Sequence, residues 1–212
     1  MKIINGNEPY TVARFASEAA VNWDAVDRAA IAVYGWNSAA SYNAYARMVY
    51  VTGYGFLVKL NCEQENPVRR FTENDDPVYQ DDAMEVFLAF SPAGYINCET
   101  NSLGARLQAF GPNRDERYSV FSKFPEGFPS EAGREGKEWT LLLRLPIADL
   151  RRFFTDLTEE ALVPGYRFTG NFYKIREADK REDSHFGMWK EIVWPVDDFH
   201  RPEQFGTLIM GE

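Results

Sequence analysis

Apolar and polar residues alternate in short runs along most of the chain, and Gly, Pro, Asn and Asp separate these runs. A period of two is typical of antiparallel strands with one buried face. A single short helix is predicted at Pro146–Phe154, where proline stands at the first position. The pattern therefore predicts an all-β sandwich or jelly roll with strands at Ala29–Val33, Tyr45–Val51, Tyr54–Leu60, Ala83–Phe90, Tyr95–Asn101, Ala105–Phe110, Trp139–Leu145, Tyr166–Ile175 and Gly206–Met210.

The length of the chain, 212 residues, suits one large β domain, and we expect a single domain over residues 1–212. The stretch Gly111–Lys137 is rich in Gly, Pro and charged residues, which predicts one long loop. Loops of this length border binding sites in some proteins and only decorate the surface in others.

The predicted strand Ala83–Phe90 has an unbroken apolar row at Met84, Val86, Leu88 and Phe90, which we expect to face the core. Glu85 then points to the opposite face. When the core faces of the neighbouring strands are matched, this opposite face collects Glu85, Tyr95, Asn97, Glu99, Asn101, Arg106 and Gln108. Such a row is either a solvated sheet face or a polar binding surface.

The composition of this face favours binding. Asn, Gln, Glu and Arg side chains beside Tyr can grip neighbouring hydroxyl groups, as a saccharide site requires. Aromatic residues make up 15% of the chain, more than a core alone requires. Tyr79, Trp36, Trp189 or Trp194 could supply an aromatic platform for the sugar ring, although each of them alone is more often a core residue.

Charge and composition exclude several other classes of protein. The net charge of −9 makes nucleic acid or an anionic membrane an unfavourable partner. Two cysteines and two histidines at these spacings predict neither a disulfide framework nor structural zinc. No apolar run reaches the roughly 20 residues of a membrane helix. We expect a cytoplasmic monomer from the chain as given, or a secreted one if a signal peptide was removed.

Three segments carry a resemblance to a known family. The run Val78–Glu85 (VYQDDAME), the hairpin Tyr95–Gly104 and the run Gly170–Lys174 (GNFYK) resemble carbohydrate-binding modules of family nine, including the C-terminal modules of xylanases and their DOMON-like relatives. The resemblance implies an immunoglobulin-like or jelly-roll antiparallel β-sandwich with one or two short helices. It also implies non-catalytic binding of glucose- or xylose-type saccharides, with calcium as a possible cofactor.

The resemblance further implies roles for individual residues. Tyr79 matches a stacking aromatic six residues before the strand glutamate Glu85, and Asn101 and Asn171 match polar sugar ligands. The family's second aromatic corresponds to Lys174, so Tyr173 or Trp189 would have to replace it. Glu99 and Arg106 complete the predicted site, Arg106 as an orienting or ligand-contacting cation.

Two other functions and a metal site remain alternatives at this point. Glu85 and Glu99 could form the carboxylate pair of a glycoside hydrolase, or a salt-bridge network with Arg106. A haem-binding electron-transfer domain could use Met48, Met84 and His185, of which His185 is as easily a packed loop residue. Oxygen ligands for calcium could come from Asp75, Asp76, Asp81 and Asp82, although their spacing is not that of an EF-hand.

Overall fold

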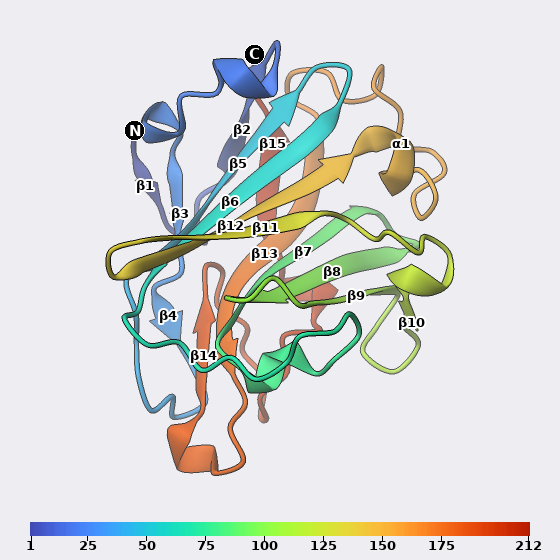
Figure 1. Cartoon of the computed structure of the whole chain (residues 1–212). Coiled ribbons are helices and arrows are strands. Elements are labelled where there is room, and N and C mark those ends of the chain that lie inside the picture. The colour runs from blue at the N-terminus through green and yellow to red at the C-terminus, as the bar shows by residue number, and fades with distance from the viewer.

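Strands dominate the computed structural model, which describes residues 1–212, and they form two packed layers (Figure 1). One layer has the order β5 (Ala44–Val51), β6 (Gly55–Glu63), β12 (Glu138–Pro146) and β11 (Ser130–Glu135). The other has the order β10 (Tyr118–Ser119), β9 (Arg106–Gly111), β8 (Gly94–Asn101), β7 (Ala83–Ser91), β13 (Arg167–Arg176) and β15 (Gly206–Met210). The predicted all-β sandwich is confirmed.

Strand β2 (Tyr10–Phe15) joins the two layers along one edge. Its first half pairs in parallel with Leu208–Met210 of β15, and its second half pairs in parallel with Val49–Val51 of β5. The sandwich is therefore one curled sheet, and it is not purely antiparallel as predicted. Four short strands extend the edges: β1 (Ile3–Ile4), β3 (Arg28–Ala30), β4 (Val33–Tyr34) and β14 (His185–Met188).

The main core lies between the layers. Strand β12 shows why the sequence folds this way, because its residues alternate between partly exposed and buried positions. Trp139, Leu141, Leu143 and Leu145 point inward, where they join Phe56, Phe172 and other apolar side chains in a cluster of 37 buried residues. This cluster is the largest of three, and it holds the layers together.

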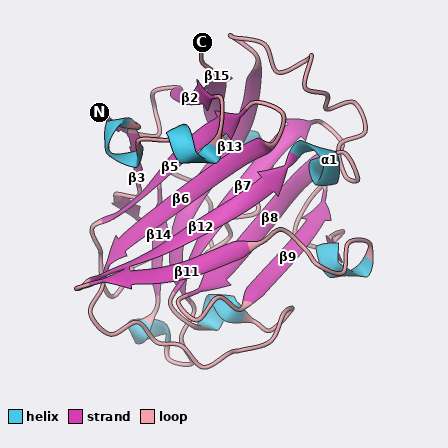
Figure 2. Ribbon diagram, turned by 45° about the horizontal axis from the view of Figure 1, so that its top comes forward, coloured by secondary structure: helices cyan, strands magenta, loops and turns pink.

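Helical structure is confined to short turns at the periphery (Figure 2). The helix α1 (Ile147–Leu150) begins after Pro146, as predicted, but it is shorter than the predicted Pro146–Phe154. No helix is both long and apolar enough to cross a membrane. The six 3-10 turns are Glu18–Ala20, Trp23–Ala25, Val78–Gln80, Val120–Ser122, Arg181–Asp183 and Pro202–Gln204.

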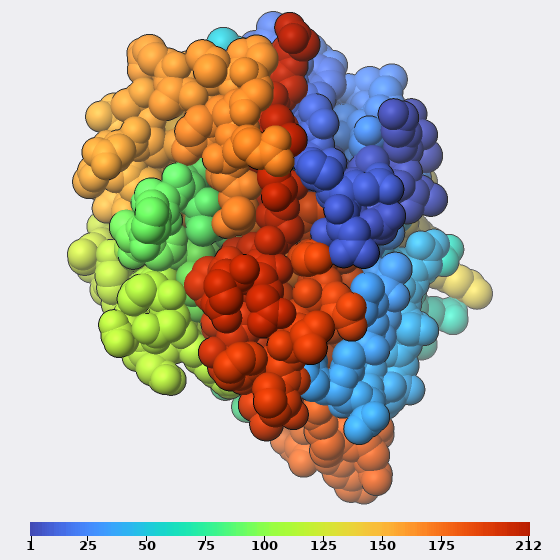
Figure 3. Space-filling model, turned by 180° about the vertical axis from the view of Figure 1, so that it is seen from behind, coloured from blue at the N-terminus to red at the C-terminus, as the bar shows by residue number.

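The outer face of the β7–β8–β13 sheet is covered by the chain between β14 and β15, residues 189–205, which we call the cover segment. Both β14 and β15 pair with β13, so the cover segment leaves this strand and returns to it. In Figure 3 it forms a red ridge between the green and the light-blue parts of the surface. A second apolar cluster, which includes Phe87, Tyr95, Tyr173, Phe199 and Phe205, fills the space beneath it.

Most predicted strands are present within a few residues of their expected bounds, and two regions differ. Ala29–Val33 is divided between β3 and β4, which pair with different strands. The predicted loop Gly111–Lys137 contains β10, a 3-10 turn and β11, whose six residues pair with β12. Strand β11 is a polar, mostly exposed edge strand, so no row of apolar residues indicates it in the sequence.

Candidate functional site

A cavity of about 310 Å³ lies where the cover segment meets the start of β7 and the end of β8. Its floor comes from the sheet and its walls from four other parts of the chain: the turn before β7, the loop after β9, the end of β13 with β14, and the cover segment. The lining residues are Tyr79, Glu85, Glu99, Leu107, Arg114, Asp115, Arg117, Ile175, Glu177, Phe186, Asp197, Asp198, Phe199 and His200.

Two carboxylates, Glu85 and Glu99, form the floor. They lie directly opposite each other on β7 and β8, a position that brings side chains into contact. Their exposed fractions are only 2% and 3%, and each has one oxygen, Oε2, that is buried without a hydrogen-bond partner. Buried polar atoms are nearly always paired in folded proteins, so these two oxygens leave hydrogen-bonding capacity unused beside the cavity.

The environment of the pair favours protonation. Burial raises the pKa of Glu85 well above its ordinary value, and the neighbouring Glu99 raises it further. Burial also raises the pKa of Glu99 to about 7, against the opposing effects of Arg117 and of the hydrogen bond from Asn97. Near neutral pH the pair therefore retains a proton, and it can both donate and accept hydrogen bonds.

Polar contacts hold the walls in place around the floor. Asn97 links them, because its Nδ2 donates to Glu99 Oε1 at 3.0 Å while its Oδ1 accepts from Arg117 at 2.9 Å. On the cover segment, Asp198 pairs with Arg201 at 2.6 Å and lies 3.9 Å from Arg114. These contacts connect the walls to the floor and to each other.

Aromatic side chains supply the apolar part of the wall. Tyr79 stands ahead of β7, and its carbonyl oxygen accepts a hydrogen bond from the Glu177 amide at 2.7 Å. Phe186 and Phe199 face the cavity from β14 and the cover segment, and Trp36 packs against both of their rings. Carboxylates beside aromatic rings are the combination that binds the hydroxyl groups and the C–H face of a sugar.

The structure brings three of the eight predicted site residues together, Tyr79, Glu85 and Glu99. Two others, Asn171 and Tyr173, hold the cover segment in place. Asn171 makes two hydrogen bonds to the backbone of Lys190, at 2.8 and 2.9 Å. The ring of Tyr173 stacks on Phe199 with 3.9 Å between centroids. The face predicted as an open binding surface is thus largely buried beneath the chain's own cover segment.

Asn101 and Trp189 also have internal partners. Asn101 donates to Asp81 and to the carbonyl oxygen of Phe71, and its own oxygen closes the turn that follows β8. Trp189 is buried in the main core, where its Nε1 donates to the carbonyl oxygen of Ile4 at 3.0 Å. Neither residue lines the cavity.

The predicted placement of Arg106 and Gln108 on the same face as Glu99 is wrong. Strand β9 pairs Leu107 with Glu99 and Gln108 with Cys98, so Leu107 shares the cavity face while Arg106 and Gln108 point to the other side. There Arg106 donates to the carbonyl oxygen of Phe128 at 2.8 Å. Arg106 is therefore not a neighbour of the carboxylate pair, and Arg117 is the cation closest to that role.

Sequence reasoning missed most of the walls. Arg114, Asp115 and Arg117 belong to the predicted loop Gly111–Lys137, and the only signal for them was the charged run that follows β9. Asp197, Asp198, Phe199 and His200 (DDFH) precede β15 without any periodicity. Burial lowers the pKa of His200 to about 2, so its ring is neutral, and its Nδ1 shares a hydrogen bond of 2.7 Å with the Tyr95 hydroxyl group.

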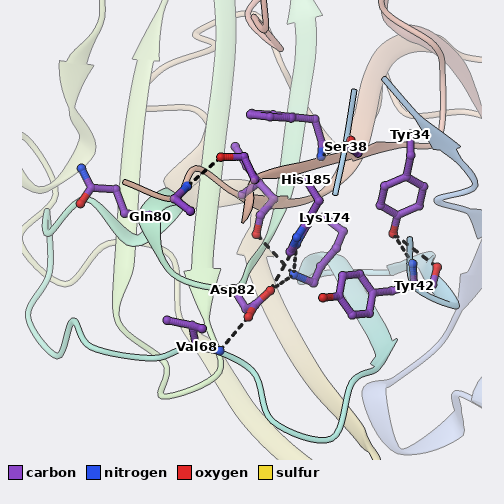
Figure 4. A network of polar contacts seen from close by, with 12 residues as sticks. Tyr34, Ser38, Tyr42, Val68, Gln80, Asp82, Lys174 and His185 are labelled. Atoms are coloured by element: carbon purple, nitrogen blue, oxygen red, sulfur yellow. Dashed lines mark hydrogen bonds and ion pairs between the residues drawn. The ribbon is translucent and has the colours of Figure 1, made fainter. Parts of the chain in front are cut away.

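Lys174 lies on the core side of β13, away from the cavity. Its Nζ is 2.5 Å from Asp82 and 2.8 Å from Nε2 of His185, in a buried network that Figure 4 shows from close by. Burial would raise the pKa of Asp82, but Lys174 and His185 outweigh this effect and lower it. Burial also lowers the pKa of His185 to about 4, so Lys174 provides the positive charge of this network.

The residues considered for haem and calcium have other contacts. Met48 and Met84 are packed in the main core, and none of Met48, Met84 and His185 lines the cavity. Asp82 accepts from Lys174 and the Val68 amide, and Asp81 accepts from the amides of residues 70 and 71. No group of three or more His, Cys, Asp or Glu side chains is arranged to hold a metal ion.

A comparison with protein families decides what kind of protein this is. A family model described as carbohydrate-binding family 9 matches residues 16–210, which is nearly the whole chain. The chain belongs to carbohydrate-binding family 9. The prediction of a carbohydrate-binding module, and not an enzyme, is confirmed by this membership. No curated protein matches the chain.

Solved structures support the fold of this family 9 module. A proposed carbohydrate-binding protein from Bacteroides uniformis ATCC 8492 shares 21% identity with a TM-score of 0.78, covering 96% of this chain and 99% of its own. A family 9 module from Caldicellulosiruptor kristjanssonii in complex with glucose shares 14% identity over 97% of both chains, with a TM-score of 0.65. Its complex with cellotriose gives 12% identity over 96% of this chain and 94% of the other, with a TM-score of 0.66.

Proposed function

We propose that this module binds one sugar residue of a glucose- or xylose-type saccharide in the cavity above Glu85 and Glu99. The observation that carries this proposal is the pair of buried carboxylates that line the cavity and whose Oε2 atoms have no partner in the protein. A partly protonated pair can donate to one sugar hydroxyl group and accept from another.

The size and the walls of the cavity support the same proposal. A volume of about 310 Å³ is at the lower end of the range for ligand pockets, which suits one sugar residue or a chain end better than the middle of a long polysaccharide. Tyr79, Phe186 and Phe199 provide aromatic surface for the C–H face of the ring. The related module from Caldicellulosiruptor kristjanssonii, in complex with glucose and with cellotriose, makes these sugars the first ligands to test.

Calorimetric titration with glucose, xylose, cellobiose and cellotriose tests the proposal. We expect binding that weakens about tenfold or more in Glu85→Ala, because the sugar hydroxyl group loses a hydrogen-bonding partner, and that also weakens in Tyr79→Ala. Glu135→Ala, an exposed residue on β11 in the other layer, is the matched control and should bind as the native chain does. If neither the native chain nor the two variants bind any saccharide, the proposal is contradicted.

A measurement of turnover separates binding from catalysis. We expect no hydrolysis of aryl glucosides or xylosides. Hydrolysis that disappears in Glu85→Gln would instead support the glycoside hydrolase alternative, in which Glu85 and Glu99 act as the acid pair.

A further inference from the structure

The charge of the cavity points to a narrower class of ligand. Six lining residues are acidic (Glu85, Glu99, Asp115, Glu177, Asp197 and Asp198), whereas the only lining cations are Arg114 and Arg117. His200 is neutral because burial lowers its pKa to about 2. The lining therefore carries an excess of negative charge, which partial protonation of the floor and the ion pairs of Asp197 and Asp198 reduce.

The cations near the cavity are already engaged. Arg117 donates to Asn97 and to the carbonyl oxygen of Arg114. Asp197 and Asp198 have their own ion pairs, with Arg181 at 3.0 Å and Arg201 at 2.6 Å. None of these guanidinium groups hydrogen-bonds to the free Oε2 atoms of the floor.

The nearest lysine does not hydrogen-bond to the floor either. Lys174 neighbours Tyr173, the residue that pairs with Glu85, but alternate residues of a strand face opposite sides. Its ammonium group lies on the core side and is held by Asp82 and His185. The fold thus buries one lysine close to the carboxylate pair and directs it away. Arg117 and Lys174 lower the pKa of Glu85 only from a distance, and neither of them bonds to the pair.

We propose that the ligand of this site is an amino sugar, a saccharide with a free protonated amino group such as a glucosamine unit, whose ammonium group lies between Glu85 and Glu99. This inference rests on the saccharide binding proposed above and specifies the sugar. An ammonium group carries three donors and one positive charge, so it satisfies both free Oε2 atoms and removes the repulsion between the carboxylates. The rings of Tyr79, Phe186 and Phe199 then cover the sugar and contribute cation–π attraction.

A metal ion is a poorer match for the same charge. Calcium takes six to eight oxygen ligands, whereas the floor offers two carboxylates and no group of three metal-ligating side chains exists in the structure. The aromatic wall also has no role around a hydrated metal ion, but it does around an organic cation.

The test compares glucosamine, glucose and N-acetylglucosamine by calorimetry on the native chain at pH 6.5. An amine of this kind titrates at about 8, as an α-amino group does, and is therefore charged there. We expect glucosamine to bind about ten- to a hundredfold more tightly than glucose, the range for hydrogen bonds to charged groups. N-acetylglucosamine, whose amide is neutral, should lose this advantage.

Proton release gives a second, independent readout. The bound ammonium group favours two ionised carboxylates, so glucosamine should expel protons that the pair holds in the free protein. The measured enthalpy should then vary with the ionisation enthalpy of the buffer for glucosamine and much less for glucose. In Glu99→Gln the preference for glucosamine should disappear, and the control Glu135→Gln should keep it.

The possible results separate this inference from the function on which it rests. If glucose binds as tightly as glucosamine, or N-acetylglucosamine binds as tightly, the amino-sugar proposal is overturned while saccharide binding stands. If spermidine binds as well as glucosamine and competes with it, while no neutral sugar competes with either, the site recognises amines without a sugar and the proposal is also overturned. If no saccharide binds at all, the proposed function itself fails.

Discussion

The carboxyl group of Glu99 shows how a single residue can couple a binding site to stability. It shares a small buried volume with Glu85, and its folded-state pKa of about 7 lies above its ordinary value of 4.5. Between these two values the folded chain holds more protons than the unfolded chain, so the free energy of unfolding falls as pH rises. Burial of Glu99 therefore lowers the free energy of unfolding least below pH 4.5 and most above pH 7.

Substitution of Glu99 by Gln should remove this pH dependence. The amide has the same shape, can still accept the hydrogen bond from Asn97, and carries no charge. We expect Glu99→Gln to exceed the native chain in free energy of unfolding by on the order of 2 kcal/mol at pH 8, with little difference at pH 5. Urea unfolding at both pH values measures this, with Glu135→Gln as the control. If the free energies of unfolding of Glu99→Gln and of the native chain differ by the same amount at pH 5 and at pH 8, the prediction is contradicted.

Lys174 is a second residue whose role depends on which face of its strand it occupies. The resemblance to the family implied an aromatic at this position, three residues after Asn171. On the regular strand β13, residues three apart point to opposite faces, so Lys174 cannot share a ligand with a residue on the face of Asn171. Its ammonium group instead neutralises Asp82 inside the sandwich.

Removal of the Lys174 charge should be strongly destabilising. Lys174→Met leaves Asp82 buried without its cation, beside a neutral His185 and the Val68 amide, and breaking a buried ion pair in this way costs about 3 to 5 kcal/mol. The double variant Asp82→Asn with Lys174→Met should recover part of this loss, since no charge is left buried. Guanidinium unfolding of the three chains provides the test, and a double variant no more stable than Lys174→Met would argue against the explanation.

Among the elements, the cover segment links the sheet to the cavity. Asn171 holds its start, Tyr173 its middle and Tyr95 its later part, through Lys190, Phe199 and His200. Because Asp197, Asp198, Phe199 and His200 also line the cavity, the order of this segment sets the shape of the binding site. A substitution that loosens the attachment of the cover segment should therefore also weaken binding in the cavity.

Phe199→Ala tests this coupling. Loss of a buried ring that contacts Tyr173, Trp36 and Phe186 should destabilise the chain by about 3 kcal/mol, and it should weaken saccharide binding as well. Amide hydrogen exchange should become faster in residues 190–205, while β5, β6 and β12 keep their protection. Val196→Ala, at a site that is 61% exposed, is the control and should change stability by less than about 0.5 kcal/mol. Equal exchange in the native and Phe199→Ala chains would contradict the coupling.

The strands that the sequence predicts well are those with one buried face. In β12 the inward positions from Trp139 to Leu145 alternate with outward ones, and the structure agrees. Every residue of β8 is buried, because the core covers one face and the cover segment the other. Where both faces of a strand are buried, the pattern of apolar and polar residues does not show which face points to the core. Leu107 on the adjacent β9 could therefore be assigned to the wrong face, and Arg106 with it.

Only a small part of the candidate site was predictable, for a related reason. Tyr79, Glu85 and Glu99 lie on or beside regular strands, where spacing determines which side chains meet. The walls come from irregular segments far apart in sequence, and their positions depend on contacts such as that of Asn97 with Arg117. Local patterns do not encode such contacts, and the cover segment itself was not predicted.

For the whole molecule, the decisive element is β2, because it pairs with a strand of each layer. The second strand and the last strand of the chain meet there in parallel, at Tyr10–Val12 and Leu208–Met210. Glycine is needed where β15 begins, since a Cβ atom at Gly206 would lie 2.4 Å from the Trp189 ring. The layers are thus joined through both ends of the chain, and we expect them to unfold as one unit.

Tyr10→Phe, which removes only the hydroxyl group, tests whether β2 joins the two layers. The Tyr10 hydroxyl group accepts from the Met48 amide at 2.9 Å and donates to the Asp27 carbonyl oxygen at 2.8 Å, so it ties β2 to β5 and to the chain before β3. Its removal leaves a buried amide without a partner, which costs about 1 to 3 kcal/mol. Because β2 belongs to both layers, far-ultraviolet circular dichroism and tryptophan fluorescence should still report one shared, earlier transition in urea. Tyr118→Phe, whose partly exposed ring lies at the outer edge of the sheet on β10, is the control. Two separate transitions in Tyr10→Phe would mean that the layers fold independently and that β2 is not the element that joins them.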